Sequence, residues 1–134
     1  MNTIQQKIVL GTAQFGSDYG ITNILGQPTK KEVFQILSFA WEKGYRRFDT
    51  APAYRSENLL GEFVLTNGLL GEAEFFTKIP PVMNSSNYRS FIRSNLENSL
   101  NNLGDKIDIL FFHNPLDSQL LLKDPEFFKN IILD

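Results

Sequence analysis

Asp49 and Tyr54 place a carboxylate and a phenol five residues apart, in a short segment that could carry acid–base chemistry. A strand-like run at 45–48 precedes Asp49, and the leucines after Tyr54 have the spacing of an amphipathic helix. In enzymes built as barrels of alternating strands and helices, catalytic residues lie at the carboxyl ends of the strands. We therefore predict that Asp49 and Tyr54 belong to an active site.

Two further polar residues, Lys78 and His113, directly follow later strand-like runs. Taken singly, each of the four candidates also has a structural interpretation. Asp49 could be a turn or cap residue, and Tyr54 could be a packing residue. Lys78 alone could be a solvated charge, and His113 could be a core imidazole bonded to the backbone. Four such residue types at the ends of three successive strands favour a common site.

The elements that must position these residues alternate along the chain. Strand-like runs span residues 7–10, 46–48, 74–77 and 107–112, separated by the length of a strand and a crossover helix. Helices are predicted to begin at Thr29, Ser56 and Asn87, with a last helical segment at 125–133. Thr29 and Glu32 form a capping-box pattern, and Ser56 is expected to cap its helix. This alternation favours an α/β fold with a parallel sheet.

The chain length limits how much of a barrel can form. An eight-stranded (β/α) barrel of the TIM type takes about 250 residues, whereas these 134 residues reach only the fourth strand. We predict a half-barrel with only the first four βα units, as a single partial domain over residues 1–134. Its first and fourth strands would keep unpaired edges, so we expect a homodimer, a partner fragment or marginal stability.

The composition argues against several classes of partner and of site. A net charge of -2 with scattered Lys and Arg gives no general attraction to nucleic acid or to a membrane surface. Residues 1–7 lack the pattern of a signal peptide and no apolar run is long enough to span a membrane, so a cytoplasmic location is expected. Without cysteines and with one histidine, the chain cannot build a thiolate or multi-His metal site, and no metal is predicted.

The segment from Asp49 to Gly61 matches Asp-Thr-Ala-x-x-Tyr-x-x-Glu-x-x-x-Gly at every fixed position, and the chain thereby resembles the aldo/keto reductase family. Residues 10–16, 76–78 and 110–115 are similar to that family's first, third and fourth strand exits. The resemblance covers the chain as the N-terminal half of a bacterial-type member. It implies reduction of an aldehyde or ketone to an alcohol with NADPH or NADH. Glu57 and Gly61 are interpreted as structural.

The resemblance also implies a role for each candidate. Tyr54 would give a proton to the substrate carbonyl. A free phenol has a pKa of about 10, and a nearby ammonium, here Lys78, favours its ionised form. Asp49 would pair with Lys78, and His113 would hydrogen-bond the substrate. Gly11, Thr12 and Asp49 would lie near the cofactor.

Most of the family's cofactor-binding surface comes from the second half of the barrel, and the chain has no Gly-x-Gly-x-x-Gly motif to replace it. We therefore expect the isolated chain to bind NADPH poorly and to turn over negligibly. The alternative function is a non-catalytic half-barrel that serves interaction or assembly. A third interpretation is a hydrolase or lyase that uses Lys78 as a Schiff-base amine.

Overall fold

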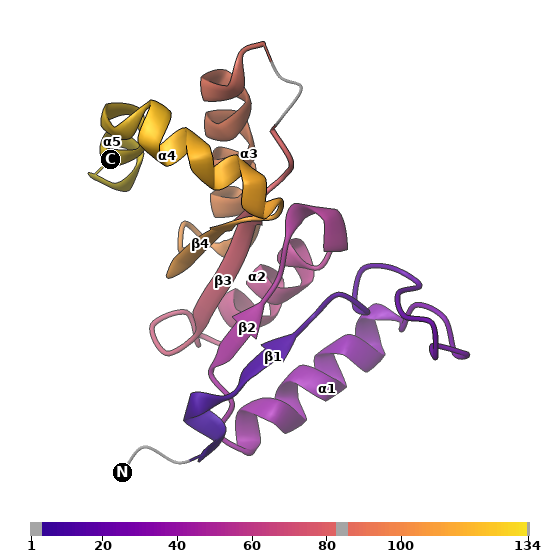
Figure 1. Cartoon of the computed structure of the whole chain (residues 1–134). Coiled ribbons are helices and arrows are strands. Elements are labelled where there is room, and N and C mark those ends of the chain that lie inside the picture. Colours follow the sequence, from indigo (N-terminus) through magenta and orange to yellow (C-terminus); the bar gives the residue numbers. More distant parts are fainter. Residues whose placement is uncertain (1–3, 83–85, 134) are drawn as a thin grey trace.

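The computed structural model describes residues 4–82 and 86–133. Within these ranges one parallel sheet has the strand order β1-β2-β3-β4 (Figure 1). The strands are β1 (Val9–Gly11), β2 (Arg47–Asp49), β3 (Glu74–Ile79) and β4 (Ile109–Phe112). The predicted α/β fold with four parallel strands is confirmed. The expectations for residues 1–3 lie outside the described residues.

Each strand is followed by helix. The helices are α1 (Lys30–Glu42), α2 (Glu57–Thr66), α3 (Tyr88–Leu103), α4 (Gln119–Lys123) and α5 (Pro125–Leu133), with short 3-10 turns η1 (Ile4–Lys7), η2 (Pro52–Tyr54) and η3 (Pro115–Ser118). The capping box before α1 is confirmed, because the Thr29 side chain accepts from the Glu32 backbone and the Glu32 carboxylate accepts from the Thr29 N–H at 2.8 Å. Helix α3 begins directly after Asn87, in agreement with the predicted start, and the Asn87 side chain accepts from the Ser90 N–H.

Two predictions about local structure are wrong. Ser56 occupies the N-cap position of α2, but its side chain makes no capping bond, because its hydroxyl is engaged by other buried hydroxyls. The first strand begins at Val9 rather than Lys7, since residues 4–7 form η1. Helix α4 was not predicted.

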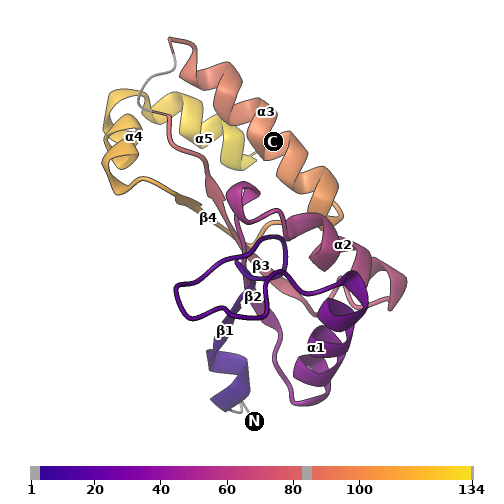
Figure 2. The same cartoon turned by 90° about the vertical axis from the view of Figure 1, so that its right-hand side faces the viewer.

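The helices cover one face of the sheet, and Figure 2 shows α1, α2 and α3 on the same side of it. In β3 the buried side chains are Phe75, Thr77 and Ile79, which alternate with less buried ones. Two apolar clusters join side chains of the strands to side chains of the helices. The first includes Val33, Leu37, Phe48, Leu60, Phe63 and Phe75, and the second includes Ile79, Ile92, Phe127 and Phe128.

Helices α2 and α3 approach each other closely at Gly61. A Cβ added to Gly61 would lie 1.8 Å from the carbonyl oxygen of Asn102 in α3, so a larger residue cannot fit without moving a helix. This contact confirms the structural interpretation of Gly61. It fixes α2, whose first turn follows the Tyr54 segment, against the body of the domain.

Candidate active site

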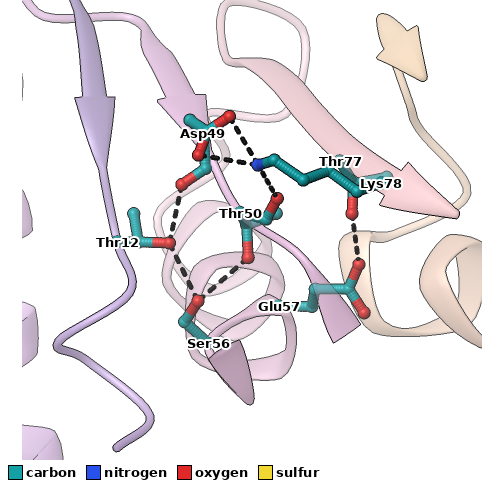
Figure 3. A network of polar contacts seen from close by, with 7 residues as sticks. All are labelled: Thr12, Asp49, Thr50, Ser56, Glu57, Thr77 and Lys78. Atoms are coloured by element: carbon teal, nitrogen blue, oxygen red, sulfur yellow. Dashed lines mark hydrogen bonds and ion pairs between the residues drawn. The ribbon is translucent and has the colours of Figure 1, made fainter. Parts of the chain in front are cut away.

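Lys78 and Asp49 form an ion pair at the carboxyl ends of β3 and β2. The Lys78 ammonium lies 2.8 and 2.7 Å from the two carboxylate oxygens of Asp49 and 2.9 Å from the carbonyl oxygen of Thr50 (Figure 3). The Lys78 side chain is 16% exposed. Three oxygen atoms therefore surround a largely buried ammonium and keep it in one place, which is the geometry that a partly buried charge requires.

Tyr54 and His113 lie on the same edge of the sheet, beside this pair. Tyr54 ends η2, and the Lys78 ammonium is 4.9 Å from the centre of its ring. The ring of His113, which follows β4, is 6.0 Å from the Tyr54 ring at 71°. The structure thus brings together all four residues that the sequence identified as catalytic candidates.

The imidazole of His113 has hydrogen-bonding capacity that the fold does not use. Its backbone N–H donates to the Ile79 carbonyl at 2.9 Å, which fixes the residue after the end of β4. Its Nδ1 is buried and has no hydrogen-bond partner among the described residues. Buried polar atoms are nearly always bonded, so packing and backbone bonds within the described residues do not account for this imidazole nitrogen.

A chain of three fully buried hydroxyls underlies the ion pair. Thr12 donates to the Asp49 carbonyl at 2.9 Å, and the Ser56 hydroxyl lies 2.8 Å from Thr12 and 2.9 Å from Thr50 (Figure 3). Each hydroxyl has one hydrogen to donate. Because Thr12 gives its hydrogen to Asp49, Ser56 must donate to Thr12, and Thr50 must donate to Ser56. The chain runs in one direction and joins β1, β2 and the start of α2.

Glu57 extends this support to β3. Its carboxylate is almost fully buried, accepts from the Thr77 hydroxyl at 2.7 Å, and is 3.4 Å from the Asn102 side-chain nitrogen. The carboxylate also lies in the first turn of α2, where the helix dipole favours negative charge. Glu57 therefore ties α2 to the strand that carries Lys78, which confirms its structural interpretation.

Gly16 is a residue of the site region whose role the sequence did not reveal. A Cβ added to Gly16 would lie 2.0 Å from the Tyr54 carbonyl oxygen, so the loop after β1 packs backbone against backbone on the Tyr54 segment. Arg55, which follows Tyr54 in the sequence, has a left-handed backbone with a φ of 56°. Together these features fix the turn that carries Tyr54. A glycine in a loop gives no signal for such a contact without the structure.

The predicted cofactor residues differ in their surroundings. Gly11 is exposed at the end of β1, and a Cβ added there would meet nothing within 4 Å. Thr12 is fully buried, and its hydroxyl is used in the chain described above. The described residues therefore leave the space beside Gly11 open, whereas Thr12 supports the strand ends from within.

Two general features of the described chain bear on the kind of site. Within residues 4–82 and 86–133, no group of three or more His, Asp or Glu side chains is close enough together to hold a metal ion. None of the helices in these ranges is long and apolar enough to cross a membrane.

Comparisons with known proteins identify relatives of this chain. The model of the family described as "Aldo/keto reductase family" matches residues 7–123. An NADPH-dependent codeinone reductase of Papaver somniferum is 33% identical over 101 residues, which cover 72% of this chain and 31% of that protein. An aldo-keto reductase of Bombyx mori is 35% identical over 89 residues, covering 63% of this chain and 29% of that protein.

Solved structures show the same likeness in three dimensions. A putative aldo-keto reductase of Pseudomonas aeruginosa has a TM-score of 0.66 and 28% identity, covering 88% of this chain and 51% of that one. An aldo-keto reductase of the silkworm Bombyx mori has a TM-score of 0.59 and 26% identity, covering 80% and 32%. These matches confirm the predicted barrel-type fold with four βα units. The chain spans about a third of the length of these curated relatives, and 51% and 32% of the two solved ones.

Proposed function

The chain belongs to the aldo/keto reductase family, and on that premise we propose that it serves the NAD(P)H-dependent reduction of an aldehyde or ketone to an alcohol. One observation carries the proposal. The largely buried ammonium of Lys78 is fixed by Asp49 at 2.7 Å and lies 4.9 Å from the centre of the Tyr54 ring, and the His113 ring lies 6.0 Å from the same ring. These are the groups that a proton donor for a carbonyl needs, at the strand ends where barrel enzymes hold their sites.

The reaction assigns one step to each group. A bound reduced nicotinamide would supply the hydride for the carbonyl carbon, and Tyr54 would give its hydroxyl proton to the carbonyl oxygen. Negative charge then develops on the phenolic oxygen, and the Lys78 ammonium stabilises it. His113 donates a hydrogen bond that orients the carbonyl. A general acid placed in this way contributes roughly a hundredfold to ten-thousandfold in rate.

NADPH is the proposed cofactor, supported by the relatives that are named NADPH-dependent and by the open space beside Gly11. The chain spans only part of those relatives, so we propose that a single copy binds NADPH weakly and turns over negligibly. Each 1.4 kcal/mol of missing contact weakens binding about tenfold. Carbonyl reduction by a single copy at the rate of a full-length reductase would contradict this.

A fusion protein tests the cofactor site. Residues 1–134 are joined to the part of the Pseudomonas aeruginosa relative that follows the matched segment, and NADPH is titrated by its fluorescence. Gly11→Leu should abolish saturable binding, since a Cβ at Gly11 meets nothing within 4 Å in this chain, and circular dichroism checks that the fold of the fusion is kept. The matched control is Gly71→Leu, since an added Cβ at Gly71 also meets nothing within 4 Å. Equal binding by both variants would place the cofactor elsewhere.

A second candidate function is a non-catalytic interaction or assembly module, and it is favoured by the edges of β1 and β4, which pair with no further strand among the described residues. Turnover that is lost in Tyr54→Phe would decide for the reductase. The Schiff-base interpretation of Lys78 would be supported by borohydride trapping of a carbonyl compound on that residue. The cytoplasmic location stays a prediction, which cell fractionation would test.

A further inference from the structure

The Lys78 ammonium uses all three of its hydrogens within the fold. An ammonium has three N–H donors, and three acceptors surround this one: the two carboxylate oxygens of Asp49 at 2.8 and 2.7 Å and the Thr50 carbonyl oxygen at 2.9 Å. Asp49 and Thr50 are consecutive residues at the exit of β2. The place of the ammonium beside Tyr54 therefore depends on where these two residues are held.

The Thr50 carbonyl and Tyr54 belong to one loop, and Ser56 closes it. The Ser56 hydroxyl lies 2.9 Å from the Thr50 hydroxyl, so the segment 50–56 returns to the residue at which it leaves β2 (Figure 3). The same hydroxyl lies 2.8 Å from Thr12 at the exit of β1. All three side chains are fully buried, so these bonds are shielded from water. The Ser56 hydroxyl therefore joins the loop that carries Tyr54 to the ends of two strands.

The loop needs such an anchor, because its backbone is strained next to Tyr54. Arg55, between Tyr54 and Ser56, has a φ of 56°, in the left-handed region that residues with a side chain rarely adopt. A backbone of this kind persists only where its surroundings impose it. Gly16 packs against it, since a Cβ at Gly16 would lie 2.0 Å from the Tyr54 carbonyl oxygen and 2.4 Å from the Arg55 carbonyl carbon. Ser56, directly after the strained residue, supplies the hydrogen bonds.

We propose that Ser56 is a positioning residue for the reduction, and that its hydroxyl fixes the separation of the Lys78 ammonium from the Tyr54 ring, which is 4.9 Å. It acts through another residue, Thr50, whose carbonyl oxygen is the third acceptor of the ammonium. Without the Ser56 hydroxyl the loop loses its closure, and the ammonium loses a fixed acceptor. Catalysis by positioned groups is sensitive to such a change, because a displacement of about 1 Å lowers the rate about a hundredfold.

The inference rests on the proposed function, in which Lys78 and Tyr54 act on a carbonyl. Its geometric part does not depend on any reaction. The Lys78 ammonium should be held less firmly in Ser56→Ala than in wild type, whether or not a carbonyl is reduced. The two failures can therefore be told apart.

Acetylation of the full chain by acetic anhydride, followed at each lysine by mass spectrometry of the peptides, tests the geometric part. A lysine nitrogen reacts only after it leaves its acceptors, so the rate at Lys78 reports how firmly the ammonium is held. Lys106 is the internal reference, because its ammonium is bonded to the main-chain carbonyls of Leu70 and Ala73. Unfolding of the whole chain exposes both lysines, whereas a loosened loop exposes Lys78 alone.

Ser56→Ala is compared with wild type and with a control variant, Ile92→Val. Ile92 is fully buried in the second cluster, so Ile92→Val lowers the free energy of unfolding by leaving a small cavity, and the three hydroxyls stay in place. We expect Ser56→Ala to raise the acetylation rate of Lys78, relative to that of Lys106, about tenfold or more, as the loss of a hydrogen bond to a charged group implies. Ile92→Val should leave this ratio at its wild-type value.

A ratio that rises equally in both variants would overturn the inference, since Ser56 would then act on stability alone. So would a ratio that Ser56→Ala leaves unchanged. In the fusion protein, Ser56→Ala should lower kcat at least about tenfold, while the KM of the carbonyl substrate and NADPH binding stay near wild type; an unchanged kcat would also overturn the inference. A fusion protein without turnover in its wild-type form would contradict the proposed function, and the acetylation ratio would still decide whether Ser56 positions Lys78.

Discussion

Removing the Ser56 hydroxyl should destabilise the protein more than removing the hydroxyl of its neighbour Thr50. Because the hydroxyl chain runs from Thr50 through Ser56 to Thr12 and the Asp49 carbonyl, Ser56→Ala leaves the Thr50 O–H without an acceptor in a fully buried place. A buried unsatisfied donor costs about 1 to 3 kcal/mol. Thr50→Val removes the bond from Thr50 to Ser56 but leaves the bond from Ser56 to Thr12 and the bond from Thr12 to the Asp49 carbonyl, and it orphans no donor, so its cost should be about 1 kcal/mol.

Urea unfolding followed by circular dichroism, at one fixed protein concentration, measures both changes. Thermal unfolding gives a second measure, because in a domain of this size each kcal/mol of lost stability lowers Tm by about 3 to 5 °C. In the double variant the donor that Ser56→Ala orphans is absent, so the combined loss should be smaller than the sum of the two single losses. Ser94→Ala, at an exposed position of α3, is the control and should change the free energy of unfolding by less than about 0.5 kcal/mol.

The direction of the hydroxyl chain is wrong if Thr50→Val costs as much as Ser56→Ala. It is also wrong if the two losses add. A free energy of unfolding that Ser56→Ala leaves unchanged would mean that the three hydroxyls do not fix the strand ends at all.

Two further perturbations test the packing and the electrostatics. Gly61→Ala should lower the free energy of unfolding by about 2 kcal/mol or more, because its Cβ would lie 1.8 Å from the Asn102 carbonyl oxygen. Urea unfolding measures this loss, with Gly71→Ala as the control because a Cβ at Gly71 meets nothing within 4 Å. A Gly61→Ala variant that loses no more stability than Gly71→Ala would contradict the prediction. The Tyr88 hydroxyl, donating to Asp124, holds the pKa of that carboxyl below its ordinary value of 3.8. The stabilisation is therefore complete above that value and is lost as the pH falls through the lower folded-state pKa. Asp124→Asn should flatten the acid limb of stability against pH, and an unaltered limb would refute this.

The parts of the fold that were predicted correctly depend on short sequence patterns or on the topology of a parallel sheet. The capping box before α1 joins Thr29 to Glu32, three residues apart, so its pattern is visible in the sequence. The proximity of Asp49 and Lys78 could be predicted because parallel strands place their carboxyl ends at one edge of the sheet. Their meeting follows from topology, without knowledge of any side-chain contact.

The parts that were missed depend on contacts between distant residues. Ser56 has the residue type and position of a helix cap, but the Thr12 hydroxyl, 44 residues away, engages it instead. Gly16 matters because the loop after β1 packs on the Tyr54 carbonyl, which no local pattern encodes. The resemblance places Thr12 near the cofactor, and that contact stays a prediction; the bond of its buried hydroxyl to the Asp49 carbonyl, 37 residues away, had no signal in the sequence.

The most direct test of the central claim is the rate of carbonyl reduction by the fusion protein with NADPH, compared between wild type, Tyr54→Phe and Tyr19→Phe. Tyr19→Phe is a matched control, because the Tyr19 ring lies 6.3 Å from the Tyr54 ring and this substitution also removes one phenolic hydroxyl. The account predicts that Tyr54→Phe lowers kcat at least about a hundredfold while Tyr19→Phe and NADPH binding stay near wild type. A Tyr54→Phe variant that reduces the carbonyl as fast as wild type would contradict the account.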